Sequence, residues 1–261
     1  MRVEAVGIGY SYDRRPALIE VSAVMESGVL SGIIGPNGSG KSTLLRIIGS
    51  VARPDAGKVL YGGADISSMP PMHRARLVGA VLQDTGAQFG FTVREVVEMG
   101  RFPHKGLLGR TDAEDRRAVA EAMERAGVLQ FADRPITALS SGERQRAFIA
   151  RALAQKPSVL LLDEPTSHLD ISYQLEVMEM LRSLAQSGTT VAIVMHDLNL
   201  AGLYCERLIA MKQGRVAASG TADEVLTPEN ILGIYGVRTL VENHPATSRP
   251  LIITLSASER Q

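Results

Sequence analysis

The sequence lacks the features that mark several large classes of protein. It contains no tryptophan, and Cys205 is its only cysteine. A lone cysteine cannot form an intrachain disulfide, which is typical of proteins from a reducing compartment. The 28 Lys and Arg residues balance the 28 Asp and Glu residues, so the formal net charge is zero. This balance argues against a strongly basic nucleic-acid binder, and we expect no nucleic acid among the partners.

Long hydrophobic runs are also missing. The best candidates, such as residues 189–195, fall well short of the ~18 apolar residues that a membrane-spanning helix needs. The opening Met-Arg-Val-Glu-Ala has no basic segment followed by a long apolar stretch, so no secretory signal is predicted. We therefore expect a cytoplasmic chain that does not cross a bilayer.

What the sequence contains is the composition and pattern of a folded α/β protein. Hydrophobic residues make up 45% of the chain and charged residues 21%, which is ordinary globular usage. The continuous apolar runs 159–162 and 190–195 predict buried strands of a parallel sheet that helices cover on both faces, and residues 171–186 between them predict a helix. The first sixty residues predict short strands around one helix, whereas residues 84–155 predict a helical insertion.

Residues 35–42, Gly-Pro-Asn-Gly-Ser-Gly-Lys-Ser, match the phosphate-binding pattern G-x-x-x-x-G-K-[ST]. They lie between a predicted strand and an apolar helix, the context that this motif requires. The glycines let successive N–H groups and the helix N-terminus converge on phosphate oxygens, Lys41 reaches the β and γ phosphates, and Ser42 ligates Mg²⁺. A Gly-rich turn with an incidental Lys is the weaker interpretation of a full match. The predicted phosphate-binding residues are Gly35, Pro36, Asn37, Gly38, Ser39, Gly40, Lys41, Ser42 and Thr43.

Two carboxylates, Asp163 and Glu164, follow the predicted buried strand 159–162. Open parallel sheets bind their ligands at the carboxyl ends of their strands. Asp163 is a predicted Mg²⁺ ligand, and Glu164 is positioned to polarise a water for in-line attack on a γ phosphate. Alone, the pair would be a solvated strand end. The phosphate-binding motif favours the catalytic interpretation.

Residues 139–143, Leu-Ser-Ser-Gly-Glu, begin a predicted helix. Ser140 and Glu143 fit the S-x-x-E capping box. A helix start with free N–H groups and hydroxyls is equally a site for an anion, so a second phosphate contact is chemically available. Local physics does not choose between the two.

The order of these motifs, followed by Met-His-Asp at 195–197, resembles the ATP-binding subunit of ABC transporters. The resemblance covers nearly the whole chain. It implies a single domain of the α/β class: a P-loop NTPase core with a parallel sheet flanked by helices, an N-terminal antiparallel β subdomain and an inserted helical subdomain. The core would comprise residues 1–83 and 158–261, and the helical subdomain residues 84–157.

The resemblance also implies roles for individual residues. Tyr12 matches the aromatic residue that stacks on adenine, with Tyr10 as a rival. Gln83 matches the glutamine that touches Mg²⁺ or the attacking water and senses the membrane partner. Asp170 matches the loop that communicates between two sites, and His196 matches the histidine that bonds the γ phosphate.

Ser140, Ser141 and Gly142 match the family signature that contacts the γ phosphate held by the opposite subunit. A homodimer would thus sandwich two ATP molecules head to tail, and hydrolysis would require it. The family usually has Gly where this chain has Ser141. A left-handed backbone at that serine would cost about 1–2 kcal/mol.

Finer features at 92–104, 166–171, 197–201 and 224–228 resemble one branch, the importers of iron-siderophores, heme and cobalamin. The resemblance implies a separate permease pair in the membrane, an extracytoplasmic binding protein and a place on the cytoplasmic face of the membrane. The alternative is a soluble ABC-type ATPase acting on DNA or ribosomes. Such proteins usually carry a long coiled-coil insertion, paired cassettes or a basic surface, none of which this sequence has.

Overall fold

A computed structural model describes residues 1–82, 90–105, 112–167 and 169–255. Its N-terminal part is an antiparallel sheet with the strand order β2-β1-β4-β5. Asp13 and Arg14, both with positive φ, form the two-residue turn between the first two strands. The strands are β1 (Val3–Tyr12), β2 (Arg15–Met25), β4 (Ala56–Tyr61) and β5 (Ala64–Asp65).

A second sheet of six strands has the order β10-β9-β3-β8-β7-β6. Every neighbouring pair is parallel except β10 and β9, which form a hairpin. The carboxyl ends of the parallel strands therefore share one edge. The strands are β3 (Leu30–Ile34), β6 (Val78–Val81), β7 (Val159–Asp163), β8 (Thr190–Val194), β9 (Arg207–Lys212) and β10 (Arg215–Thr221).

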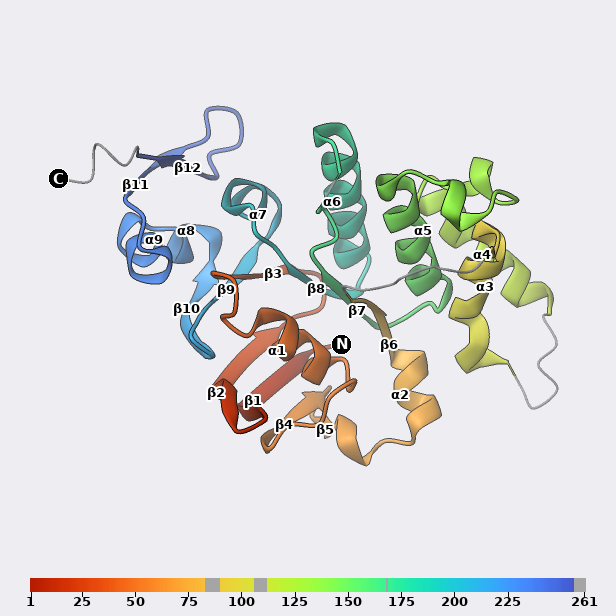
Figure 1. The fold of residues 1–261 in the computed structure, drawn as a ribbon, viewed down its shortest axis with the longest axis horizontal. Coiled ribbons are helices and arrows are strands. Elements are labelled where there is room, and N and C mark those ends of the chain that lie inside the picture. Colours follow the sequence, from red (N-terminus) through yellow and green to blue (C-terminus); the bar gives the residue numbers. More distant parts are fainter. Residues whose placement is uncertain (83–89, 106–111, 168, 256–261) are drawn as a thin grey trace.

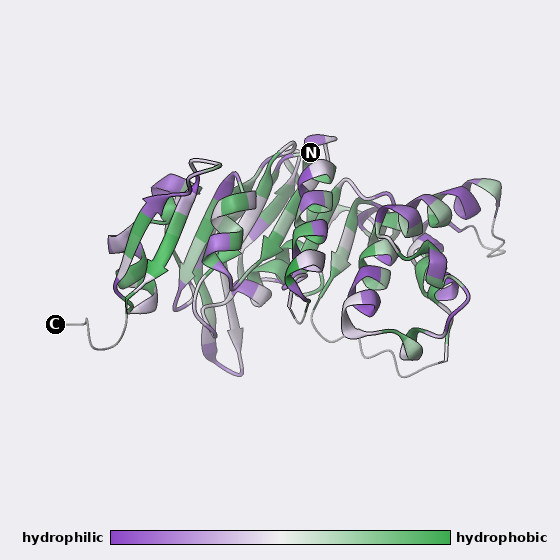
Figure 2. Cartoon of the chain, turned by 90° about the horizontal axis from the view of Figure 1, so that it is seen from above, coloured by the Kyte–Doolittle hydropathy of each residue, from purple (hydrophilic) through white to green (hydrophobic). Residues whose placement is uncertain are grey.

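This sheet separates two hydrophobic cores. Leu161 packs in the core that α1 (Lys41–Ile48) and the antiparallel sheet build on one face, whereas Leu160 and Leu162 pack in the core of the other face. Helices α6 (Ile171–Gln186) and α7 (Leu198–Tyr204) lie on that second face (Figure 1). Hydrophobic residues accordingly gather on the strands between the layers (Figure 2). The predicted strands buried on both faces are confirmed.

The helices between β6 and β7 gather at one end of the molecule (Figure 1). Three of these helices each contribute one fully buried residue where they meet: Val97, Met123 and Ile149. Directly before β6 the chain forms the 3₁₀ turn η1 (Ile66–Ser68) and α2 (Pro71–Leu77). Between β6 and β7 lie α3 (Val93–Glu98), α4 (Ala113–Arg125), α5 (Ser141–Ala154) and the 3₁₀ turns η2 (Met99–His104), η3 (Leu129–Phe131) and η4 (Ile136–Ala138).

After the six-stranded sheet the chain forms two short helices and a separate hairpin. The Asn199 side chain both donates to Ile252 O (3.1 Å) and accepts from Ile252 N (2.7 Å), which fixes the hairpin to α7. No helix among the described residues is long and apolar enough to cross a membrane. The elements are α8 (Ala222–Val225), α9 (Pro228–Tyr235), β11 (Thr239–Asn243) and β12 (Pro250–Thr254).

Candidate active site

The loop between β3 and α1 has the backbone of a phosphate cradle. Gly35, Gly38 and Gly40 all have positive φ, between 76° and 148°. A Cβ at Gly35 would lie 2.2 Å from Met211 O, and one at Gly40 would lie 2.7 Å from Ala17 O. These two positions need glycine both for their φ and for the close approach of neighbouring backbone.

Lys41 begins α1 with its side chain folded back over the loop. Its Nζ donates to Gly35 O (2.9 Å) and to Pro36 O (3.0 Å). Burial lowers the pKa of this ammonium group, while the charges of Glu164 and Asp163 act in the opposite direction. A buried cation at the N-terminus of a helix is a strong site for an anion, because both fields favour negative charge.

Asp163 ends β7 beside the first turn of α1. Ser42 Oγ donates to Asp163 Oδ1 (3.1 Å), which joins residues 121 positions apart. Burial raises the pKa of Asp163, as does the nearby charge of Glu164. Within the described part of the chain, the buried Oδ2 atom has no hydrogen-bond partner. A buried carboxylate oxygen that accepts no hydrogen bond, together with a serine hydroxyl, supplies oxygen ligands of the kind that Mg²⁺ prefers.

Glu164 follows directly with a left-handed backbone, φ 52°. Its carboxylate is held from two sides: His196 Nε2 lies 2.5 Å from Oε1, and Ser167 Oγ donates to Oε2 (3.1 Å). A non-glycine residue in this conformation costs free energy that the surrounding contacts must offset, and such residues cluster at functional sites. The structure thus brings together two predicted catalytic residues from the ends of neighbouring strands.

Lys41, Ser42, Glu164 and His196 line a cavity of about 680 Å³. Tyr12 also lines this cavity, and Tyr10 packs edge-on against Tyr12 at 4.9 Å between ring centroids. Of the two rival tyrosines, Tyr12 therefore faces the cavity. The lining residues are Tyr12, Arg15, Pro16, Ala17, Asn37, Gly38, Gly40, Lys41, Ser42, Thr43, Glu164 and His196.

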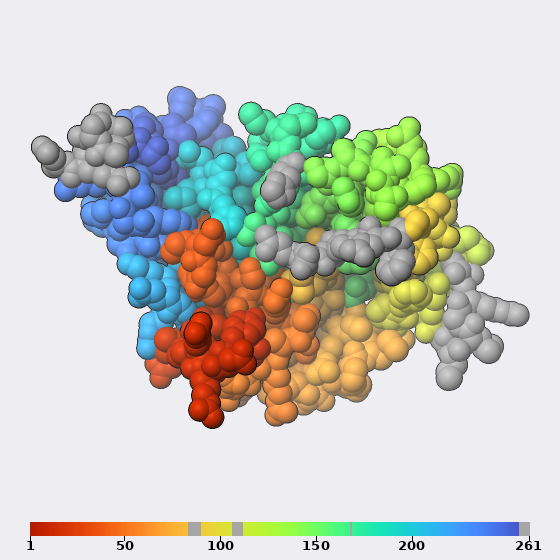
Figure 3. All heavy atoms as spheres, in the orientation of Figure 1, coloured from red at the N-terminus to blue at the C-terminus, as the bar shows by residue number. Residues whose placement is uncertain are grey.

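The Leu-Ser-Ser-Gly-Glu segment lies elsewhere. Ser140 caps α5, and both arms of the predicted capping box are present: Ser140 Oγ accepts from Glu143 N, and Glu143 Oε2 accepts from Ser140 N. Ser141 is the first residue of the helix and is not among the positive-φ residues, so no left-handed penalty arises there. None of these residues lines the cavity. Residues up to about 50 and residues from about 125 to 150 occupy separate parts of the surface (Figure 3).

Other site residues divide into those that the sequence predicted and those that it missed. Asp170 is the N-cap of α6, where its Oδ1 accepts from Tyr173 N (3.1 Å). Gln83 lies outside the described residues. Ser167 and Arg15 were missed. Ser167 could have been found from its position three residues after Glu164, within turn reach, whereas only the tertiary fold brings Arg15 to the cavity.

Comparison with known proteins decides the family. The family model described as "ABC transporter" matches residues 18–167, more than half of the chain. The chain belongs to the ABC transporter family. The match begins in β2 and ends three residues after Glu164. It therefore includes the phosphate loop, the signature segment, Asp163 and Glu164.

Full-length relatives extend the likeness to the remaining segments. The cobalamin import ATP-binding protein BtuD of Halobacterium salinarum is 43% identical over 98% of this chain, which spans 64% of that protein. The iron(3+)-hydroxamate import ATP-binding protein FhuC of Bacillus subtilis is 40% identical over 97% of this chain and 94% of its own length. An inward-facing structure of a candidate metal-chelate type ABC transporter aligns with a TM-score of 0.85 at 25% identity, covering 98% of both chains.

These findings confirm the family and the fold class predicted from the sequence. The relatives are named as ATP-binding proteins of importers, and one solved structure that the chain resembles is described as a dimeric bacterial ABC transporter cassette. The roles of individual residues in this cassette, its metal and its cargo remain predictions.

Proposed function

We propose that this cassette hydrolyses ATP to power the import of a metal chelate through a separate membrane permease. The observation that carries the proposal is the convergence of the phosphate loop, Asp163, Glu164 and His196 at the carboxyl edge of one parallel sheet. The groups come from the ends of three strands, β3, β7 and β8, and in-line attack on a bound phosphate needs such groups on two sides of the reacting atom.

The chemistry of the cavity fits ATP with Mg²⁺. The loop glycines and the N-terminus of α1 would hold the phosphates, with Lys41 supplying positive charge. Ser42 and Asp163 would hold the metal, since Asp163 Oδ2 has no donor among the described residues. Bound Mg²⁺ neutralises charge on the β and γ oxygens. Tyr12, which also lines the cavity, would offer a ring face for the adenine.

Glu164 is the proposed general base. Ser167 and His196 fix its two carboxylate oxygens, so the group has one orientation toward the cavity. His196 would bond the γ phosphate from the same side. A base held in place reduces the reorganisation needed when it accepts the proton of the attacking water.

A second copy completes the site in this proposal. Ser140, Ser141 and Gly142 lie at the N-terminus of α5, and none of them lines the cavity. A head-to-tail homodimer would bring this end of α5 against the γ phosphate in the partner's cavity. The helix dipole favours that contact.

The names of the relatives support this class of cargo. Their names specify cobalamin and iron(3+)-hydroxamate, both metal chelates, and the aligned transporter structure is of a candidate metal-chelate type. We place the cassette at the cytoplasmic face of the membrane, bound to a permease pair that an extracytoplasmic binding protein supplies. Gln83 would sense this permease.

The substitution Glu164→Gln tests the catalytic assignment. The amide keeps the size and hydrogen-bonding reach of the side chain but cannot accept the proton, so hydrolysis should slow by about 10²–10⁴-fold while ATP still binds. The variant should accumulate as an ATP-bound dimer, measured by light scattering after gel filtration. Steady-state phosphate release measures the rate of hydrolysis, and calorimetry measures ATP binding.

The exposed Glu229→Gln serves as the matched control, because it makes the same chemical change on α9, away from the cavity. It should hydrolyse ATP like the unaltered chain. Near-normal turnover of Glu164→Gln would refute the assignment of Glu164 as the base.

A further inference from the structure

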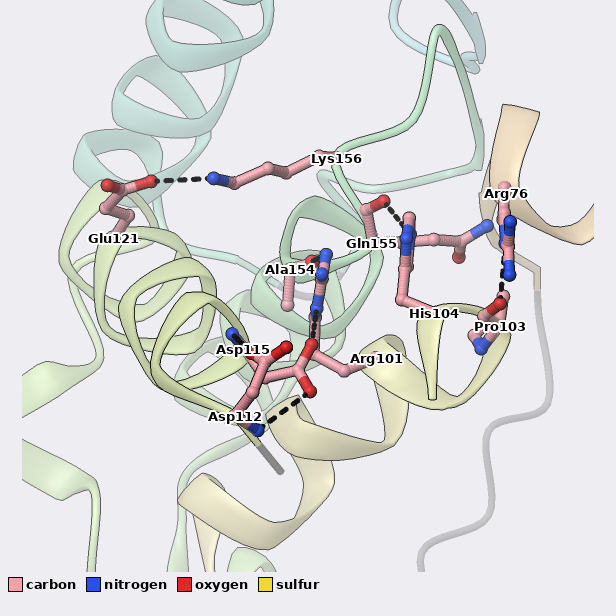
Figure 4. Close-up of polar contacts among 10 residues, drawn as sticks. All are labelled: Arg76, Arg101, Pro103, His104, Asp112, Asp115, Glu121, Ala154, Gln155 and Lys156. Carbon is pink, nitrogen blue, oxygen red and sulfur yellow. Dashed lines mark hydrogen bonds and ion pairs between the residues drawn. The ribbon is translucent and has the colours of Figure 1, made fainter. Parts of the chain in front are cut away.

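The helix that begins with the signature segment is anchored at its other end by a polar junction. The last carbonyl groups of a helix lack intrahelical donors. At the end of α5, Arg101 Nη1 donates to Ala154 O (2.9 Å), and His104 Nε2 lies 2.8 Å from Gln155 O (Figure 4). Both side chains come from the 3₁₀ turn η2. A cation at this position also complements the negative end of the helix dipole.

Arg101 reaches a third element with the same guanidinium group. Its Nε donates to Asp115 Oδ1 (2.7 Å), and Asp115 forms the capping box of α4 with Asp112 (Figure 4). Arg101 is 3% exposed and Asp115 4%. Burial acts to raise the pKa of Asp115, but the hydrogen bonds from Arg101 and Asp112 and the charge of Arg101 outweigh it, and the pKa is lowered. One buried cation therefore joins η2, α4 and α5.

The backbone fit at this junction is as close as the polar contacts. A Cβ at Gly100 would lie 2.0 Å from Arg151 O. The backbone of η2 consequently lies directly on the last turn of α5, with no room for a side chain between them. Gly100 permits η2 to lie this close to α5, and the hydrogen bond from Arg101 to Ala154 O holds the two elements together.

The same junction is tied to the six-stranded core. Arg76 Nε, from α2, donates to Pro103 O (2.8 Å), and Gln155 Nε2 donates to Val78 O (2.7 Å) of β6. The end of α5 is thus connected to the edge strand of the sheet as well as to η2 and α4. A shift of this end relative to the core would break several hydrogen bonds at once.

Buried ion pairs are poor sources of stability, because the cost of removing two charges from water offsets their attraction. In some proteins they are retained because they fix a geometry. At 14 residues, α5 is about 21 Å long, and a helix of this length transmits a tilt from one end to the other. A misplacement of about 1 Å in a catalytic group can reduce the rate by about 100-fold.

We propose that Arg101 is a positioning residue that fixes the axis of α5 and so places Ser141 and Gly142 for contact with the nucleotide of the partner cassette. This inference rests on the proposed function, since it requires the signature end of α5 to meet ATP across a dimer. Arg101 acts from the far end of the helix and touches neither nucleotide nor cavity.

The test is Arg101→Met in the full chain. Methionine fills much of the space but removes both donor contacts, to Asp115 and to Ala154 O. We expect kcat for ATP hydrolysis to fall by about 10-fold or more. The Kd for ATP should stay within about 2-fold, because the phosphate loop is untouched, and in the Glu164→Gln background the ATP-dependent dimer should dissociate more readily. Hydrogen exchange of the amides in the first turn of α5 should quicken.

Two further variants make the result specific. Lys156→Met breaks the exposed pair with Glu121 (3.5 Å), which also joins α4 to the end of α5, and should leave kcat within about 2-fold. Arg101→Lys keeps the charge without the planar fork, so it should recover part of the rate. If Arg101→Met does not fold, a folded Arg101→Lys with unaltered kcat overturns the proposal.

Equal effects of Arg101→Met and Lys156→Met would also overturn it, as would unaltered kcat together with unaltered exchange in α5. If the unaltered chain shows no ATPase activity, the proposed function fails instead. In that case the exchange measurement still decides whether Arg101 controls the first turn of α5.

Discussion

Asp163 shows at the scale of one residue how the role we propose for it conflicts with stability. Its carboxylate is buried at the end of β7, and burial raises its pKa because the charged form has lost water. Ser42, Arg46 and Lys41 lower the pKa, but they do not outweigh burial. A buried carboxyl whose folded pKa is raised destabilises the fold at neutral pH, where it must ionise.

Asp163→Asn should therefore raise the melting temperature of the nucleotide-free protein while it lowers ATP hydrolysis by about 100-fold or more. Asparagine has nearly the same shape and removes the charge whose burial is costly. Scanning calorimetry and phosphate release measure the two effects. Asp133→Asn, a change at an exposed carboxylate, is the control and should alter neither by much. A lower melting temperature for Asp163→Asn would contradict this account of the site.

At the scale of elements, capping boxes define several helix starts. Ser140 with Glu143, Thr92 with Glu95 and Asp112 with Asp115 all make the reciprocal pair of contacts. The hydrogen bonds of Ser140 lower the pKa of Glu143, which keeps this partner charged near neutral pH. In α5 the capped end is also the helix start that we propose to meet the partner's nucleotide.

Ser140→Ala and Thr92→Ala separate these two roles. Each should cost about 1 kcal/mol of cap stabilisation and lower the melting temperature by about 2–4 °C. Only Ser140→Ala should also weaken the ATP-dependent dimer, because only α5 faces the partner cassette in our proposal. Thermal unfolding and light scattering provide the comparison. Equal dimer affinities in the two variants would limit Ser140 to capping.

Two neighbouring elements, α2 and β6, were not predicted. Pro71 begins α2, and its last residue, Leu77, leads directly into Val78 of β6. No turn residue separates the two, so the sequence has no local boundary signal there. Parallel pairing with β7, about 80 residues later, makes Val78–Val81 a strand. Gly79 fits because a Cβ there would lie 2.9 Å from Pro157.

At the scale of the whole molecule, residues up to about 50 and residues from about 125 to 150 occupy separate parts of the surface (Figure 3), and no signature residue lines the cavity. In our proposal, one cassette presents half of each of two sites, and a second copy completes both. Two equal sites would result from one head-to-tail contact with twofold symmetry.

Affinity capture of the tagged Glu164→Gln chain with ATP, from gently solubilised native membranes, tests the assembly. We expect a polytopic permease among the captured proteins, because the proposed closed dimer is the form that engages it. Mass spectrometry identifies the partners and any bound iron, heme or cobalt. Capture of ribosomal or DNA-repair proteins without a membrane protein would refute the transport proposal and leave the ATPase assignment intact.

The sequence by itself determined the features that depend on neighbours along the chain. The phosphate loop needs glycine at defined positions, and the caps at Ser140 and Asp170 need partners three residues away. Helix α6 begins and ends where its pattern predicts, at Ile171 and Gln186. These interactions form within one or two turns, so the order of residues is sufficient to predict them.

Only the tertiary structure decided which distant groups meet. The Ser42–Asp163 contact, the choice of Tyr12 over Tyr10 for the cavity wall and the burial of Arg101 against Asp115 all depend on how strands and helices pack. Such contacts form only when separate elements bury their hydrophobic faces together. Patterns within a short stretch of sequence therefore do not predict them. The motifs therefore predicted the chemistry of the candidate site, whereas the packing of the two cores determined the geometry of that site.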